Sequence, residues 1–330
     1  MTIFPIQEVS MSTNSFLGLL KDWDPRADQV LLQPERNEPG YWIGCPGVFG
    51  GKHTYFTYRE RRPRNLDFER GWKCGVKSLS EEGASSDLWT VRKDELETAS
   101  MERFALNYAG GKWELYLSFV DPADDRWRVD VVRADSIENF DVASRENVLT
   151  AASTETEGVK DPFIYREGDK EYMFLSVAQA PEISDPEAAH GTQDIFNTGH
   201  TLSSTGLAVR EAGGDWVWRG IVLEPGDDGS WDQNTRRINS VLKLTDGYLA
   251  FYDGKESHES NYEEKTGLAV SSDLLHWNVI SDDEPFILSD SESGSLRYLD
   301  YRIASDSIDL IYEITRPDTS HEARMHRVSL

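Results

Sequence analysis

The decisive stretch of this sequence is Gly158-Val-Lys-Asp-Pro-Phe-Ile-Tyr-Arg-Glu-Gly-Asp-Lys-Glu-Tyr-Met-Phe-Leu-Ser-Val177. Two apolar and aromatic runs, residues 163–165 and 172–177, flank a charged turn that contains Gly168. Such runs separated by a polar turn with glycine predict a β-hairpin. The proline after Asp161 favours an extended Asp161, so we expect this carboxylate at a strand entrance. The alternative is an Asp-Pro pair that only caps a turn.

The same pattern of apolar run, polar turn and aromatic run recurs along the chain. The other copies are residues 42–58, 101–120, 238–253 and 296–312. Third strands are expected at residues 71–76, 127–133, 205–209, 266–270 and 323–328, and fourth strands at 88–91, 148–150, 217–223 and 277–280. Repeated units of several strands are typical of β-propellers. The sequence therefore predicts an all-β fold, a five-bladed β-propeller.

The fifth unit reaches Leu330 before a fourth strand, which leaves an outer strand edge unpaired. Exposed edges promote aggregation, and residues 28–33 are the only strand-like segment before the first unit. We therefore expect this N-terminal strand to pair alongside residues 323–328 and close the ring. No Pro- or Ser-rich linker divides the chain, so we expect one domain over residues 1–330, with residues 1–40 partly irregular. Helical patterns are confined to residues 16–23 and 94–101.

The chain is strongly acidic, with 59 Asp and Glu against 34 Lys and Arg and a net charge of −25. This charge argues against nucleic acid as a partner, because phosphate is repelled. Only 11 of the basic residues are lysine, and an acidic, lysine-poor surface is typical of salt-adapted proteins. We therefore expect a halophilic or salt-tolerant protein, with an ordinary acidic protein as the alternative.

The first 20 residues lack the basic start and apolar centre of a secretory signal, and no run of 18 apolar residues follows. We expect a cytoplasmic protein without a membrane span. Cys45 and Cys74 fall on the first and third strands of one unit, so reduced thiols are expected rather than a disulfide. The scattered histidines predict no zinc site, and the acidic loops contain no ligand pattern for Ca²⁺. We therefore expect no cofactor, with a Ca²⁺ ion bound among the acidic loops as the alternative.

Charged and aromatic clusters gather in the loops of one predicted face. In an up-and-down unit, the start of the first strand and the loop between the second and third strands share a face. Four of the seven histidines fall there, namely His190, His200, His258 and His321. Because function is usually carried by loops on a rigid scaffold, we expect the site on this face. The alternative is that these polar loops are merely solvated.

Two motifs resemble the five-bladed propeller glycosidases of families 43, 32 and 68. Lys160-Asp161-Pro162-Phe163 is similar to their Asp-Pro motif. Residues 266–277, TGLAVSSDLLHW, are similar to their recurring Gly-x-Ala-x-Ser-x-Asp-x-x-x-Trp strand. The resemblance spans nearly the whole chain and implies a carbohydrate substrate. It also implies that Asp161 orients the substrate and raises the pKa of the acid, with a first-unit Asp as base or nucleophile and a fourth-unit Glu as acid.

The sequence departs from that pattern at two positions. The first-unit position reads Cys45-Pro46, and the fourth-unit position falls near Asn239-Ser240. Glycoside cleavage still requires an acid and a base or nucleophile. The candidate catalytic residues are therefore Asp161, Glu102, Asp232, Glu263, Glu264 and Glu313, and the candidate substrate-binding residues are Arg61, Arg62, Arg236, Arg237, His190, His258, Asp300 and His321.

Three functions are consistent with these residues. The first is a glycoside hydrolase that uses displaced carboxylates. The second is a phosphorylase resembling family 130, in which phosphate replaces the missing base and arginines bind it. The third is a non-catalytic carbohydrate-binding propeller. In the first case, the dense arginines of residues 59–64 would instead recognise a carboxylated sugar such as a uronic acid.

Overall fold

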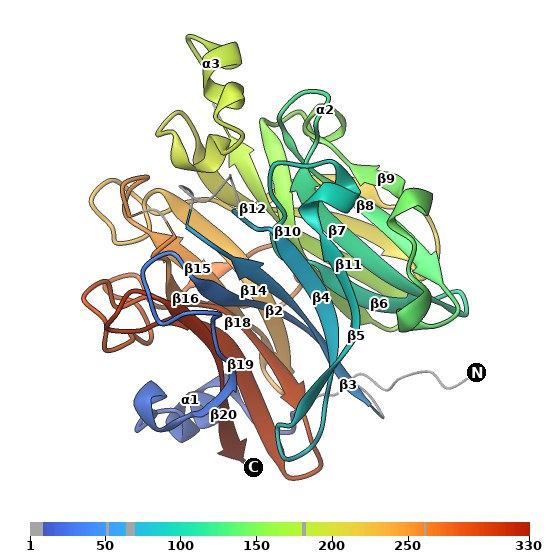
Figure 1. The fold of residues 1–330 in the computed structure, drawn as a ribbon. Coiled ribbons are helices and arrows are strands. Elements are labelled where there is room, and N and C mark those ends of the chain that lie inside the picture. The colour runs from blue at the N-terminus through green and yellow to red at the C-terminus, as the bar shows by residue number, and fades with distance from the viewer. Residues whose placement is uncertain (1–8, 51–52, 64–69, 180–182, 261) are drawn as a thin grey trace.

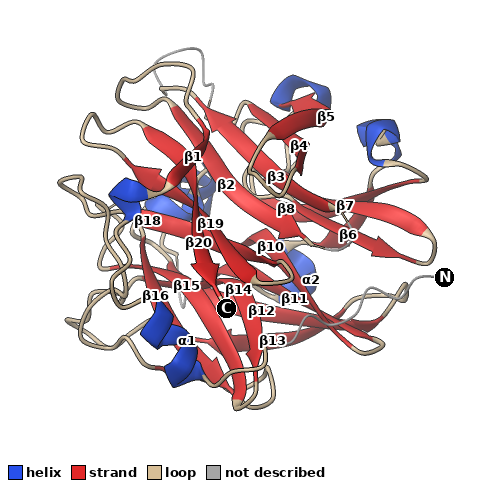
Figure 2. Cartoon of the chain, turned by 90° about the horizontal axis from the view of Figure 1, so that it is seen from below, coloured by secondary structure: helices blue, strands red, loops and turns tan. Residues whose placement is uncertain are grey.

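The structure is a computed structural model that describes residues 9–50, 53–63, 70–179, 183–260 and 262–330. β-Strands dominate it, and the few helices are short and peripheral (Figure 1, Figure 2). In this part of the chain, no helix is both long and apolar enough to span a membrane. The predicted all-β class is confirmed.

The strands pair antiparallel in successive groups of four. The first group is β2 (Trp42–Phe49), β3 (Thr54–Arg61), β4 (Lys73–Leu79) and β5 (Ser85–Arg92). The second is β6 (Ala105–Ala109), β7 (Lys112–Val120), β8 (Trp127–Ala134) and β9 (Glu146–Leu149). The third is β10 (Gly158–Glu167), β11 (Lys170–Gln179), β12 (Leu202–Glu211) and β13 (Val217–Leu223).

The fourth group is β14 (Thr235–Leu244), β15 (Gly247–Lys255), β16 (Lys265–Ser271) and β17 (Asn278–Val279). The fifth is β18 (Leu296–Ile303), β19 (Ser307–Thr315), β20 (His321–Ser329) and, from the N-terminal region, β1 (Gln29–Leu32). The predicted pairing of residues 28–33 with residues 323–328 is confirmed, because Gln29 lies opposite Met325 and Val30 opposite Arg324. The predicted hairpin of residues 158–177 is also confirmed, as β10 and β11.

Three short α-helices accompany the strands in the described part of the chain. They are α1 (Thr13–Leu19), α2 (Ala151–Thr154) and α3 (Pro186–Gly191). The pattern at residues 16–23 corresponds to α1, and the pattern at 94–101 overlaps a 3₁₀ turn at Lys93–Leu96. Helix α3 was not predicted, although Asp185 accepts a hydrogen bond from the Ala188 N–H (3.1 Å) and Pro186 occupies the first helical position. Both features are signals of a helix start.

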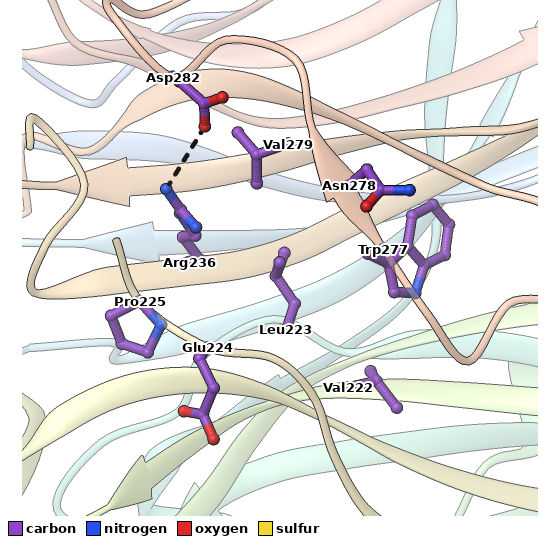
Figure 3. A pocket seen from close by; sticks show the side chains of 9 residues that line it. All are labelled: Val222, Leu223, Glu224, Pro225, Arg236, Trp277, Asn278, Val279 and Asp282. Atoms are coloured by element: carbon purple, nitrogen blue, oxygen red, sulfur yellow. Dashed lines mark ion pairs between the residues drawn. The ribbon is translucent and has the colours of Figure 1, made fainter. Parts of the chain in front are cut away.

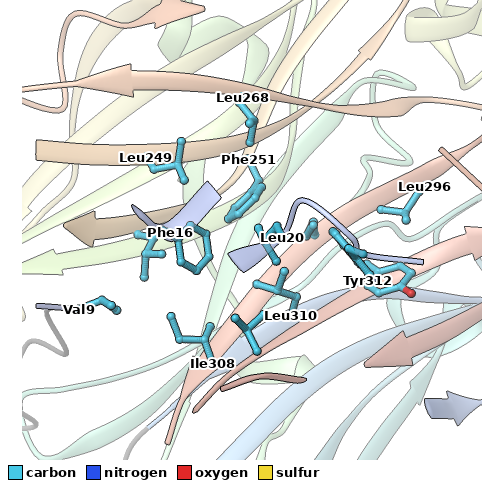
Figure 4. Packing of buried hydrophobic residues seen from close by; sticks show 14 of the residues in the cluster. Val9, Phe16, Leu20, Leu249, Phe251, Leu268, Leu296, Ile308, Leu310 and Tyr312 are labelled. Carbon is cyan, nitrogen blue, oxygen red and sulfur yellow. The ribbon is translucent and has the colours of Figure 1, made fainter. Parts of the chain in front are cut away.

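A hydrophobic core lies between α1 and the strands of the fourth and fifth groups. Phe16 and Leu20 of the α1 segment pack in one buried cluster with Leu249 and Phe251 of β15 and Leu310 of β19 (Figure 4). A helix of seven residues is marginal by propensity alone. Tertiary packing therefore accounts for most of the stability of α1.

Single parallel pairs join neighbouring groups at one end of the fold. Ser203 of β12 pairs with Thr235 of β14, and Lys265 of β16 pairs with Leu296 of β18. His321 of β20 pairs in the same way with Trp42 of β2. Each link joins the start of the third strand in one group to the start of the first strand in the next. The links lie at the end of the fold where the sequence predicts the long polar loops.

Candidate functional site

The first strands of four groups contain a register shift at matched places. The shifts lie between Gly44 and Gly47, Lys160 and Phe163, Ile238 and Ser240, and Arg297 and Asp300. Within three of them stand Cys45, Asp161 and Tyr298, with φ values of 59°, 55° and 53°. Left-handed backbone is costly for non-glycine residues and often occurs at functional sites, where bulges redirect side chains.

The expectation of an extended Asp161 is wrong, because the bulge places this residue in left-handed backbone. Hydrogen bonds hold it there: the Asp161 N–H donates to Ser118 Oγ (3.2 Å), and the Arg103 N–H donates to Asp161 Oδ1 (3.0 Å). Arg237 Nη1 donates to the other carboxylate oxygen at 2.7 Å. Burial opposes ionisation of Asp161, but Lys160 and Arg237 hold its pKa below the usual value.

A polar pocket, called the central pocket below, opens beside Asp161. Its lining consists of Glu102, Lys160, Ser176, Phe196, Asn197, Ser203, Thr235, Arg237, Lys255, Tyr262, Glu264, Arg297 and Tyr298. The open space at its centre is about 10 Å³, roughly the room that one water molecule needs. A sugar ring can therefore enter only when some of the lining side chains or loops move.

Cys45, Glu102 and Asp161 converge next to this pocket, and of the three Glu102 is part of its lining. Their polar atoms lie within 4.8 Å of one another, and all three residues are buried. Arg59 donates to the Glu102 carboxylate, and its Nη2 lies 3.7 Å from Glu313 Oε2. The carboxylates of Glu102 and Asp161 therefore lie close together where the resemblance implies catalytic chemistry.

The same three residues are the only cluster with metal-ligand spacing in the described part of the chain. Arginines already neutralise both carboxylates, since Arg59 contacts Glu102 and Arg237 contacts Asp161. Burial also raises the pKa of the Cys45 thiol, which disfavours the thiolate that a metal requires. The donor set therefore fits a metal ion poorly.

A buried ion network forms one wall of the pocket. Arg297 donates to Glu264 and, through Nη2, to Glu313 Oε1 (2.7 Å). The His321 ring contacts Glu313 with Nδ1 at 2.7 Å. Burial opposes ionisation of Glu264 and Glu313, but Arg297 holds the pKa of each carboxyl well below its usual value. Glu263, about a quarter exposed, accepts from Ser293 Oγ at the edge of this wall (2.5 Å).

Arg61 is enclosed by aromatic rings. Its guanidinium carbon lies 4.3 Å from the centre of the Trp42 ring and 3.7 Å from that of Tyr262. The second strand of the first unit, expected to end by residue 58, extends through Arg59 and Arg61 as β3, and the first strand pairs with both. Arg62 instead lies near the surface and donates to Glu35 (2.7 Å). Residues 64–69, which include the rest of the predicted arginine cluster, lie outside the described residues.

Some predicted site residues lie away from the central pocket. Asp232 is fully buried and accepts from Tyr252 (2.6 Å) and Arg236 (2.6 Å). Arg236 faces a different pocket, between β13 and β17 (Figure 3). His190 is buried against Glu157, with Nε2 2.8 Å from its carboxylate, and His258 is exposed.

Asp300 lies below the pocket rather than in its lining. Its carboxylate accepts from Arg103 Nη2 (2.6 Å) and from the Val48 N–H (2.8 Å). Arg103 also donates to the Asn239 carbonyl (2.7 Å), so it ties the bulges of β14 and β18 together. Asp300 and Arg103 therefore hold the backbone around the site.

Most residues that line the pocket were not predicted as site residues from the sequence, and five unpredicted residues of the site bear directly on its charge and shape. Lys160 and Lys255 line the pocket. Arg297 binds the carboxylate of Glu264, and Asp253 binds the guanidinium group of Arg237. Tyr298 stands in a bulge. Lys160 was visible in the sequence, because it directly precedes Asp161. The other four depend on cross-strand register, for which the sequence carried no separate signal.

Comparisons with known proteins support the fold. No protein-family model matches the sequence, and no curated protein matches it. A solved structure described as a glycoside hydrolase superposes with a TM-score of 0.66 at 12% identity, covering 97% of this chain and 96% of that one. A GH43_1 enzyme from Xanthomonas citri gives a TM-score of 0.57 at 12% identity, with 96% and 93% covered.

A third structure comes from work on the GH130 family of mannoside phosphorylases, which contains glycoside hydrolases that target β-1,2 mannosidic linkages in Candida mannan. It gives a TM-score of 0.59 at 12% identity, with 88% of this chain and 85% of that one covered. At this identity, the likeness concerns the fold. The chain thus shares its fold with solved glycoside hydrolases, in agreement with the resemblance indicated by its sequence motifs.

Proposed function

We propose that this protein is a glycoside hydrolase whose reaction takes place in the central pocket. The observation that carries the proposal is the convergence of Glu102 and Asp161 within 4.8 Å in a buried polar site. Glycoside cleavage uses a pair of carboxyl groups on either side of the scissile bond. The fold shared with glycoside hydrolases supports the same function.

The two carboxylates are suited to different roles. Asp161 stays ionised, because Lys160 and Arg237 hold its pKa low, so it is the candidate nucleophile or charge-stabilising group. Glu264 is also ionised and is bound by Arg297. Glu102, brought within 4.8 Å of Asp161, is the candidate for the carboxyl group that transfers the proton to and from the glycosidic oxygen. Glu313 and His321 position Arg297 and do not themselves face the substrate.

The separation of the carboxylates favours retention of anomeric configuration. Retaining enzymes have carboxyl groups about 5–5.5 Å apart, whereas inverting enzymes leave roughly 6.5–9.5 Å for a water molecule. One carboxylate oxygen of Glu102 and one of Asp161 lie within 4.8 Å of each other, which favours the retaining spacing. Proton NMR of the first product formed should show the anomer of the substrate; the opposite anomer would contradict this assignment.

We further infer that the five groups of strands are the blades of one propeller domain. In this arrangement β1 supplies the fourth strand of the last blade and closes the ring. The parallel pairs between groups and the bulges of the first strands would then face a common centre. That centre coincides with the pocket lined by Glu102 and Tyr298.

Phosphorolysis is a second candidate, favoured by Cys45. This thiol stands in the bulge where the resemblance implies a carboxylate base, and its raised pKa makes it a poor substitute. A phosphorylase needs no such base, because phosphate is the nucleophile. The pocket also contains cations that can bind phosphate, namely Lys160 and Lys255.

A panel of aryl glycosides, assayed with and without inorganic phosphate, tests both candidates. The proposed hydrolase should release the aryl group at equal rates in both conditions and give the free sugar. Release that requires phosphate and gives a sugar phosphate would establish the second candidate instead. No release from any aryl pyranoside or furanoside, with oligosaccharides left intact, would contradict both.

A further inference from the structure

Two lysines of the central pocket are buried, and among the described residues neither forms an ion pair shorter than 3.9 Å. Lys160 belongs to β10 and Lys255 ends β15, with exposed fractions of 6% and 4%. An ammonium group is costly to bury unless a negative charge compensates it. The contacts of these two side chains therefore indicate what the pocket is built to hold.

Lys255 has a neutral partner. Its Nζ donates to Asn197 Oδ1 at 3.0 Å, and among the described residues no carboxylate forms an ion pair with it. Burial lowers the pKa of Lys255 to about 8; the negative charge of Glu264 opposes this shift, and the positive charge of Lys160 adds to it. Lys255 is thus a strong donor whose charge is not neutralised by direct contact.

Lys160 is only weakly paired. The nearest carboxylate oxygen, Asp161 Oδ2, lies 3.9 Å from its Nζ and already accepts from Arg237 at 2.7 Å. The ammonium otherwise faces the rings of Phe196 and Trp127, with distances of 4.5 and 5.0 Å to their centres. Lys160 therefore also has donor capacity left for a ligand.

Hydroxyl groups connect the two lysines across the sheet. Lys160 lies opposite Ser176, and Ser176 Oγ is 2.9 Å from Ser203 Oγ. Ser203 pairs with Thr235, which lies opposite Lys255. The register of β10, β11, β12, β14 and β15 thus builds a row that starts and ends with an ammonium group and has small polar side chains between. Ammonium and hydroxyl donors together suit an oxyanion.

We propose that Lys160 and Lys255 bind an oxyanion in the central pocket, either the carboxylate of an acidic sugar or inorganic phosphate. The inference rests on the proposed function, because it names the class of substrate that the same site takes. The flexible four-carbon stems of lysine allow the two ammonium groups to separate around the ligand. Glu102 and Asp161 lie beside them, at the position of the bond to be cleaved.

Binding of the oxyanion should depend on pH. The charged groups that act on Lys255 come from several elements and are Lys160, Asp194, Arg237 and Glu264. Because the folded-state pKa of Lys255 is about 8, its ammonium is lost as pH rises through that value. Affinity for the anion should be full at pH 6.5 and fall between pH 7.5 and 9, roughly by the tenfold expected from losing one charged hydrogen bond.

Isothermal titration calorimetry tests the site without an activity assay. The probes are D-glucuronate, D-galacturonate and inorganic phosphate, with D-glucose and D-galactose as neutral counterparts of the two uronates. Lys160→Met and Lys255→Met should each weaken binding of the preferred anion by about tenfold or more, since hydrogen bonds to charged groups contribute about 1.5–3 kcal/mol. Lys112→Met removes an exposed lysine of β7 and serves as the matched control.

The outcomes separate the two ligands and the two proposals. A uronate that binds more tightly than its neutral counterpart identifies an acidic sugar as the ligand, and binding of phosphate alone identifies phosphate as the ligand. Cleavage of neutral glycosides without binding of any anion overturns this inference and leaves the proposed function intact. Anion binding without cleavage of any glycoside upholds the site and removes the proposed function. If both lysine variants fail to fold, an affinity of the unmodified protein that does not change from pH 6.5 to 9 overturns the inference.

Discussion

At the scale of single residues, Glu313 holds together the ion network behind the pocket. It is fully buried and contacts Arg297, Arg59 and His321. Glu313→Gln keeps the shape but leaves two guanidinium groups without this counter-charge. We expect it to lower the free energy of unfolding by about 3–5 kcal/mol, as for other broken buried ion pairs. Urea denaturation checks this.

Glu146→Gln is the control for that measurement. Glu146 is paired with Arg133, but its side chain is 71% exposed. The change should therefore alter the free energy of unfolding by less than about 0.5 kcal/mol. Equal effects of the two substitutions would show that the buried network contributes no more than a surface pair.

Acid sensitivity follows from the same network. The pKa values of Glu313, Glu264 and Asp161 are held below their usual values by neighbouring cations. Their contribution to stability is therefore present above pH 4.5 and is lost as pH falls through the lower folded-state values. The free energy of unfolding should fall steeply between pH 4.5 and 3, and by a smaller amount in Glu313→Gln. Equal acid losses in both proteins would contradict this.

At the scale of elements, β1 is tied to the fifth group by both packing and polar contacts. Leu32 is buried in a cluster with Ile43 and Met325, whereas Val30 is 38% exposed. Just before β1, the Asp28 carboxylate accepts a hydrogen bond from the Tyr312 hydroxyl (2.5 Å). An otherwise unpaired edge of β20 is thereby covered.

Shortening Leu32 tests how much this strand stabilises the protein. Leu32→Ala should lower the free energy of unfolding by about 2–3 kcal/mol, because it leaves a cavity in the cluster. Val30 lies two residues earlier in the same strand but is exposed. Val30→Ala should therefore lower the free energy of unfolding by less than about 1 kcal/mol. The melting temperature measured by calorimetry should fall clearly only for Leu32→Ala. An unchanged melting temperature would mean that β1 is detached in solution.

At the scale of the whole molecule, the net charge of −25 produces strong self-repulsion. Salt screens this repulsion, since the Debye length shortens from about 10 Å at 0.1 M to about 3 Å at 1 M. We expect the melting temperature to rise between 0.1 and 1 M NaCl, by several degrees. A melting temperature that is flat or falls with NaCl would contradict the prediction of a salt-adapted protein.

The sequence was most informative where the signal is local or repeats. Alternating apolar runs and glycine turns predicted the strands, and the lone N-terminal segment at residues 28–33 predicted the partner of β20. Asp161 and Cys45 could also be singled out, because each directly precedes a proline in a recurring motif. Their left-handed backbone could not, because it comes from bulges fixed by neighbours such as Ser118 and Arg103.

Contacts between distant strands were beyond sequence reasoning. The register of five strands places Lys255 in the same row as Lys160, and a bulge places Tyr298 in the site. Asp232 and His190 illustrate the opposite error. Both have residue types typical of active sites, but they are buried with partners elsewhere, Asp232 against Arg236 and His190 against Glu157.

The central claim, that the pocket of Glu102 and Asp161 cleaves glycosides, is tested most directly by Asp161→Asn. Asp309→Asn is its control. Asp309 is also buried and is bound by two arginines, Arg302 and Arg327, but it lies near the start of β19 and is not part of the pocket lining. On a glycoside that the unmodified protein cleaves, Asp161→Asn should lower kcat/KM by at least about 100-fold, whereas Asp309→Asn should leave it within a few-fold. Equal turnover by a folded Asp161→Asn variant would contradict the account.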